Sequence, residues 1–118
     1  MDKRILLSKV QYLSSIFILV SFLFQVKYLK DNLFTILIIG LIFFLVLTFA
    51  HYIRDKKEKG VLVGSIILGL FNILGYGIFG VPENLALNLT TIAVFDALVS
   101  LAQFFVVVIS FSLLEKKK

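Results

Sequence analysis

Four long apolar stretches constrain this chain more than any other feature. They run from about Ile5 to Val26, Leu33 to Ile53, Val61 to Gly80 and Leu85 to Leu114. A helix of about 20 apolar residues crosses the hydrocarbon of a bilayer, and each stretch reaches that length. A backbone in lipid must satisfy its own hydrogen bonds, so each stretch is expected to be helical. The sequence therefore predicts an all-α integral membrane protein, a four-transmembrane-helix bundle with up-down topology.

The composition fits one membrane domain and leaves little room for anything else. Of 118 residues, 60% are hydrophobic and 16% are charged, and the mean hydropathy is +1.06. A soluble domain of this length needs more polar surface to cover its core. Only short charged clusters separate the apolar stretches, so we expect residues 1–118 to form a single transmembrane domain.

The distribution of lysine and arginine predicts the orientation. The N-terminus, the second loop and the C-terminal tail together carry ten of them, and the first loop carries two, Lys27 and Lys30. Basic residues accumulate on the cytoplasmic side of membrane proteins. We therefore expect both termini inside, in a multi-pass protein of the cell or cytoplasmic membrane.

The same basic clusters predict one partner and argue against another. Arg54, Lys56, Lys57 and Lys59 in the second loop, with the lysines at 116–118, are expected to attract anionic lipid headgroups. Each is worth about 1 kcal/mol near the surface. Because topology already accounts for a pI of about 9.6, we expect no binding of nucleic acid.

Catalytic, metal and cofactor sites are not expected. The chain has no cysteine and one histidine, His51, which disfavours thiol chemistry, haem ligation from two sides and multi-histidine metal centres. No serine lies near a base in the sequence pattern, and no carboxylates are paired. We therefore expect a protein that is not an enzyme.

The third apolar stretch carries small residues at helical spacing. Gly60 and Gly64 are four residues apart, as are Ser65 and Gly69, and Gly75 extends the strip. Helices in lipid associate through close approach at small residues, so these five are predicted to pack against another helix. The partner helix belongs either to this chain or to another membrane protein, including a second copy.

The fourth stretch carries a polar stripe around one acid. Asp96, Ser100 and Gln103 follow at spacings of four and three, which places them on one helical face. Asn72 and Tyr76 lie at comparable depth in the third stretch, and we expect the short connection to bring them within reach. These five residues form the candidate ion or proton site.

The depth of Asp96 depends on where the fourth helix begins. Pro82 and Glu83 suit a first helical turn, because proline lacks the N–H that is unpaired there and an acid faces the positive end of the dipole. With that start, Asp96 lies only a few Å outside the midplane.

Asp96 has two interpretations. In the first it binds a proton or cation, because an acid within a span is costly and is often functional. In the second it is protonated and only hydrogen-bonds Asn72 or Tyr76 across a packing face.

Two functional hypotheses follow. The leading one is a non-enzymatic small membrane protein that binds other membrane components, as an accessory subunit or as an immunity- or stress-type protein. The alternative is a small oligomeric transporter or channel subunit in which Asp96 couples to a proton or cation.

Overall fold

The structure is a computed structural model that describes residues 3–26, 33–55 and 59–115. Within these residues, four helical rods are long and apolar enough to cross a membrane. They are α1 (Lys3–Gln25), α2 (Leu33–Asp55), a composite rod that begins at α3, and α5 (Thr90–Glu115). The prediction of an all-helical bundle with four membrane-length helices is confirmed. The basic residues at 27, 30, 56, 57 and 116–118 lie outside the described residues, as do the side chains of Arg54 and Lys59.

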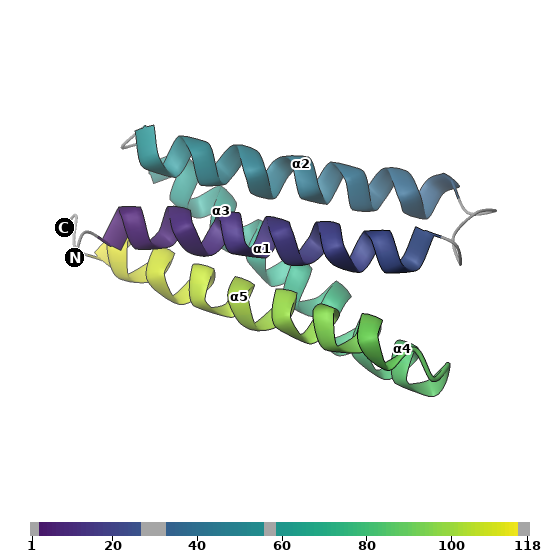
Figure 1. Ribbon diagram of the computed structural model, residues 1–118. Helices are drawn as coiled ribbons and strands as arrows, with labels where there is room; N and C mark the ends of the chain where they lie inside the picture. The colour runs from purple at the N-terminus through teal and green to yellow at the C-terminus, as the bar shows by residue number, and fades with distance from the viewer. Residues whose placement is uncertain (1–2, 27–32, 56–58, 116–118) are drawn as a thin grey trace.

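The rods alternate in direction, so α1 begins and α5 ends at the same end of the bundle (Figure 1). We call this the terminal end. The opposite end, where α1 finishes and α5 begins, is the distal end. The bundle measures 47 × 22 × 20 Å, and its long axis follows the helices.

The third rod has three parts: α3 (Lys59–Asn72), the π-helix η2 (Ile73–Gly80) and α4 (Val81–Ala86). The N–H of Val81 donates to the carbonyl of Tyr76, five residues back, as a π turn requires. Gly75, Gly77 and Gly80 make this segment a weak α-helix former, because glycine costs about 1 kcal/mol in a helix interior. The wide turns also ease the clash that the Pro82 ring would make with the carbonyl of residue 78 in an α-helix.

The turn between the third and fourth rods lies at 87–89. Asn88 has a φ of 62° and follows α4 in the left-handed conformation that asparagine tolerates. Its N–H donates to Leu85 and that of Leu89 donates to Asn84, at 3.1 and 2.8 Å. Together these bonds form a Schellman motif.

This turn differs from the sequence-based expectation, which placed Pro82 and Glu83 at the start of the fourth helix. Pro82 and Glu83 do lie in the first turn of a helix, but that helix is α4, which ends the third rod at Ala86, and the fourth rod begins at Thr90. Because α5 starts later, Asp96 lies about 10 Å distal to the middle of that helix, rather than a few Å from the midplane.

The apolar core lies in two clusters along the bundle. At the terminal end, Leu7, Ile53, Leu62 and Val106 are fully buried, and they come from all four rods. Farther along, Ile18, Val46 and Val99 form a second cluster from α1, α2 and α5. Neither η2 nor α4 contributes a fully buried side chain. The third rod is therefore packed closely at the terminal end and loosely at the distal end.

Candidate functional site

Asp96 is the buried acid of the candidate site, with 2% of its surface exposed. Both of its carboxylate oxygens accept hydrogen bonds from neighbouring rods. Ser21 of α1 donates its hydroxyl to Oδ1 at 2.9 Å, and Asn84 of α4 donates Nδ2 to Oδ2 at 2.6 Å. The carboxylate is thus held in place by two other rods.

The backbone of the third rod comes close to this carboxylate. A Cβ added at Gly80 would lie 2.9 Å from Oδ2 of Asp96, so glycine is what lets η2 approach here. Three residues nearer the terminal end, a Cβ added at Gly77 would collide with the hydroxyl of Ser100. The glycines of η2 therefore seat the π-helix against the polar face of α5.

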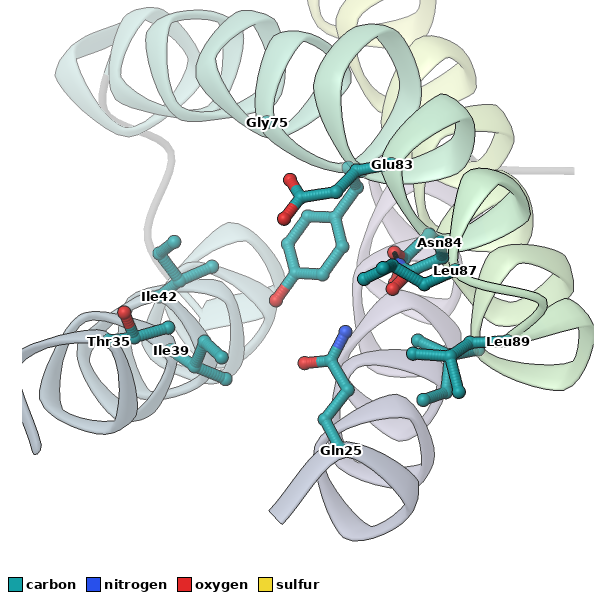
Figure 2. Close-up of a pocket in the computed structure, with 13 residues that line it drawn as sticks. Gln25, Thr35, Ile39, Ile42, Gly75, Glu83, Asn84, Leu87 and Leu89 are labelled. Atoms are coloured by element: carbon teal, nitrogen blue, oxygen red, sulfur yellow. Dashed lines mark hydrogen bonds between the residues drawn. The ribbon is translucent and has the colours of Figure 1, made fainter. Parts of the chain in front are cut away.

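A cavity of about 400 Å³ borders Asp96 at the distal end. All four rods line it, and Figure 2 shows Gln25 and Glu83 pointing into it, across from Ile39 and Ile42 of α2. Tyr76, Asn84 and Asp96 also line it. The buried acid therefore belongs to a space with a second carboxylate, two amides and a phenol.

The middle of the bundle holds a chain of three buried amides. Asn72 of α3 donates Nδ2 to Oε1 of Gln103, and Gln103 donates Nε2 to Oε1 of Gln11, both at 3.1 Å. All three side chains are at most 1% exposed. Hydrogen bonds between helices are one of the main attractions available in lipid, so this chain ties α3, α5 and α1 together.

Further buried polar atoms have no hydrogen-bond partner among the described residues. They are Nε2 of Gln11, Oδ1 of Asn72, the hydroxyl of Tyr76 and the hydroxyls of Ser14, Ser65 and Ser110. Leaving such a group unpaired costs about 1–3 kcal/mol. Polar groups with unused hydrogen-bonding capacity thus continue from the cavity toward the terminal end.

The predicted ion-site residues separate into two groups. Asp96 and Tyr76 line the distal cavity, and Ser100 lies beside Gly77. Asn72 and Gln103 bond each other instead, so Asn72 does not supply a hydrogen bond to Asp96. The reason is the register of α5: Gln103 lies two turns from Asp96 toward the terminal end, at the level of Asn72.

The predicted packing residues also have different surroundings. A Cβ at Gly64 would lie 2.8 Å from the Phe49 ring of α2, and one at Gly69 would lie 2.7 Å from Val107 of α5. Ser65 is fully buried. Gly60 and Gly75 are exposed, and an added Cβ there would meet nothing within 4 Å. Gly75 instead lines the distal cavity.

Sequence reasoning missed Asn84 because it placed this residue at the start of the fourth helix, beyond the reach of Asp96. The available signal was Asn88, a residue that commonly ends a helix in the left-handed conformation. With the turn at Asn88, the third rod extends past Asn84, which then faces the beginning of α5. Ser21 was one of several polar residues in α1, and its spacing alone did not single it out.

Among residues 3–26, 33–55 and 59–115, no three His, Cys, Asp or Glu side chains gather where they could hold a metal ion. Comparisons with known proteins add no further guide to the site. No protein-family model, no curated protein and no solved structure matches the chain. The functional argument therefore rests on the geometry around Asp96.

Proposed function

We propose that this chain binds a proton or small cation at Asp96 and serves as a small oligomeric transporter or channel subunit. The observation that carries the proposal is the position of Asp96, which is buried and yet borders a cavity of about 400 Å³ that reaches the distal end. A purely structural acid would be enclosed by packing. Here the carboxylate is fixed by Ser21 and Asn84 and has open space beside it.

The proposed orientation places both termini in the cytoplasm, in the cell or cytoplasmic membrane. The support is the accumulation of ten of the twelve basic residues at the end that carries the termini and the second loop. In this orientation the Asp96 cavity faces the opposite side of the membrane. Because the native chain has no cysteine, single cysteines at Asn88 and at Lys118 can be labelled with an impermeant maleimide. Labelling of Asn88→Cys from outside intact cells, and of Lys118→Cys only after permeabilisation, would agree with this orientation.

The polar interior supports movement of a cation or proton beyond simple binding. The amides of Gln11, Asn72 and Gln103 and the unpaired hydroxyls continue from the cavity toward the terminal end. Charged species cross a hydrocarbon layer only where polar groups replace water. A non-enzymatic transport role uses these groups without requiring any bond to be made or broken.

The test is flux in liposomes that contain the purified protein. Wild-type protein is expected to carry protons or an alkali cation, and Asp96→Asn is expected to abolish the flux. Ser112→Ala is the matched control, because Ser112 bonds Lys3 at the terminal end and lies far from the cavity. Equal flux through wild type and Asp96→Asn would remove Asp96 from the mechanism and end this proposal.

A second candidate is an accessory protein that binds other membrane components, and α2 favours it. Only 11% of its membrane span is buried inside the bundle, against 33–44% for the other three spans. Leu37, Leu41 and Phe44 are more than half exposed on one side of α2. A specific membrane partner would co-purify with the wild type and be lost in Leu41→Ala, while flux through liposomes would be absent from both.

A further inference from the structure

The distal cavity is larger than a bound metal ion or proton needs. Its volume of about 400 Å³ falls within the range of about 300–1,000 Å³ that is usual for small-molecule sites. At about 30 Å³ for each water molecule, it has room for roughly a dozen. An ion at Asp96 would leave most of this space to something else.

The charge of the lining selects for a cation. Asp96 and Glu83 are both carboxylates, and the lining residues that the structure describes include no lysine, arginine or histidine. Oδ1 and Oδ2 of Asp96 are already held by Ser21 and Asn84, which fix the carboxylate so that it needs no reorganisation on binding. The site is preorganised for a positive group.

The walls away from these carboxylates are apolar. Ile39 and Ile42 of α2 line one side, and Leu87, Leu89 and Ile92 line the other. Tyr76 adds an aromatic ring, and its buried hydroxyl has no partner among the described residues. An aromatic face attracts ammonium groups, and the attraction strengthens where water is excluded.

We propose that the natural occupant of the Asp96 cavity is an amphiphilic organic cation, an ammonium group joined to an apolar body. This inference rests on the proposed cation-binding function and names the class of cation. The ammonium group lies against Asp96 and Tyr76, and Glu83 adds a second negative charge. The apolar body lies along Ile39 and Ile42.

Glycine positions supply the matched variants for the test. Gly75 lines the Asp96 cavity, and a Cβ added there would meet nothing within 4 Å, so the side chain of Gly75→Leu starts in open space beside the ligand. Gly40 is also exposed and equally free of neighbours, but it lines a smaller apolar cavity of about 120 Å³ that shares Ile39, and none of the polar lining, with the Asp96 cavity. Gly40→Leu is therefore the control for bulk and added apolar surface.

The experiment is calorimetric titration of the detergent-purified full chain with benzyltrimethylammonium. Neopentylbenzene, its uncharged carbon isostere, is the control ligand, and sodium and potassium chloride are the ion controls. We expect saturable binding of the ammonium compound, weakened roughly tenfold or more by Asp96→Asn and by Gly75→Leu. Gly40→Leu should bind as the wild type does. Circular dichroism and size-exclusion chromatography check that each variant keeps its helices and its size.

The outcomes separate this inference from the function on which it rests. Equal binding of neopentylbenzene, or undiminished binding to Asp96→Asn, would overturn the organic-cation assignment. If benzyltrimethylammonium does not bind while Asp96-dependent flux of protons or alkali cations persists, the inference fails and the proposed function stands. If both binding and flux are absent, both are wrong.

Discussion

The two ends of the bundle are built from the same four rods, but they differ in how the third rod meets its neighbours. At the terminal end, Leu7, Ile53, Leu62 and Val106 interlock, and α3 approaches both α2 and α5 through Gly64 and Gly69. At the distal end, η2 contacts α5 through Gly77 and Gly80 and leaves a cavity on the side of α2. Small residues of the third rod therefore allow close contact with both α2 and α5 at the terminal end, but with α5 alone at the distal end.

We infer from this difference that the terminal end and the middle of the bundle provide most of its stability, and that the distal end provides the binding site. Close packing of small residues and shared hydrogen bonds are the main source of helix association in lipid, and they are concentrated at the terminal end and the middle. The distal end gives up packing on one side and gains a space that reaches a carboxylate. We therefore expect substitutions at the terminal end and in the middle to change stability, and substitutions around the cavity to change binding.

The largest expected effect on stability is at Gly69, and it tests directly whether the terminal end is packed more closely than the distal end. Gly69→Leu forces a side chain into Val107 and the backbone carbonyl of Gln103, and overpacking of this kind costs about 1–3 kcal/mol or more. Gly75→Leu adds the same atoms at the distal end, where an added Cβ meets nothing within 4 Å. Unfolding in mixed micelles, followed by circular dichroism, should show a large loss for Gly69→Leu and almost none for Gly75→Leu. Similar losses for both would mean that the two ends are packed alike.

The next effect concerns the amide chain in the middle of the bundle. Gln103→Leu leaves Nδ2 of Asn72 and Oε1 of Gln11 without their partner, and we expect a loss of about 1–3 kcal/mol. The triple variant Gln11→Leu, Asn72→Leu and Gln103→Leu should recover part of this loss, because it removes the unpaired groups as well. The same unfolding assay measures both. A triple variant less stable than Gln103→Leu alone would assign the amides a packing role that leucine cannot fill.

A smaller effect is expected at the distal turn. Asn88 has a φ of 62°, and a β-branched residue in this conformation costs about 1–2 kcal/mol. Asn88→Val should lower stability by that amount, and Asn88→Gly should be neutral within a few tenths. Because the turn positions Asn84, cation binding should weaken in Asn88→Val and persist in Asn88→Gly. A neutral Asn88→Val would show that the turn does not fix the end of α4.

The smallest effect on stability is expected for Asp96→Asn. This variant tests most directly whether residues around the cavity affect binding rather than stability. Asparagine has nearly the same shape, and both Ser21 and Asn84 can exchange donor and acceptor roles to bond it. The free energy of unfolding should change by less than about 1 kcal/mol, within the usual range of volume-conserving substitutions. Flux should be lost at the same time, and cation binding should be weakened roughly tenfold or more. A strongly destabilised Asp96→Asn would return Asp96 to the role of a packing residue.

The sequence predicted the four helices because length and apolarity alone determine a membrane span. It also placed Asp96 and Gln103 on one face of the fourth helix, and both are buried. It did not predict the partners of Asp96, because Pro82 and Glu83 mark the start of α4, a short helix within the third rod, and not the start of the fourth span. Residue-by-residue register between helices is also set by local departures from 3.6 residues per turn, such as η2. Neither composition nor hydropathy records them.

The third rod, which contains the π-helix between Ile73 and Gly80, makes the candidate site sensitive to the number of its residues as well as to their identity. Each residue inserted or deleted in a helix turns everything beyond it by about 100°. A deletion within the π-helix would be largely absorbed, because its wide turns tighten to α turns that hold fewer residues. A deletion in α3, which is already α-helical, would instead rotate Asn84 away from Asp96, although both side chains would be unchanged. The chemistry of the carboxylate is thus coupled to how the backbone is wound several residues away. Single insertions and deletions in the third rod can therefore change the hydrogen bonding of Asp96 while leaving the composition of the chain almost unchanged.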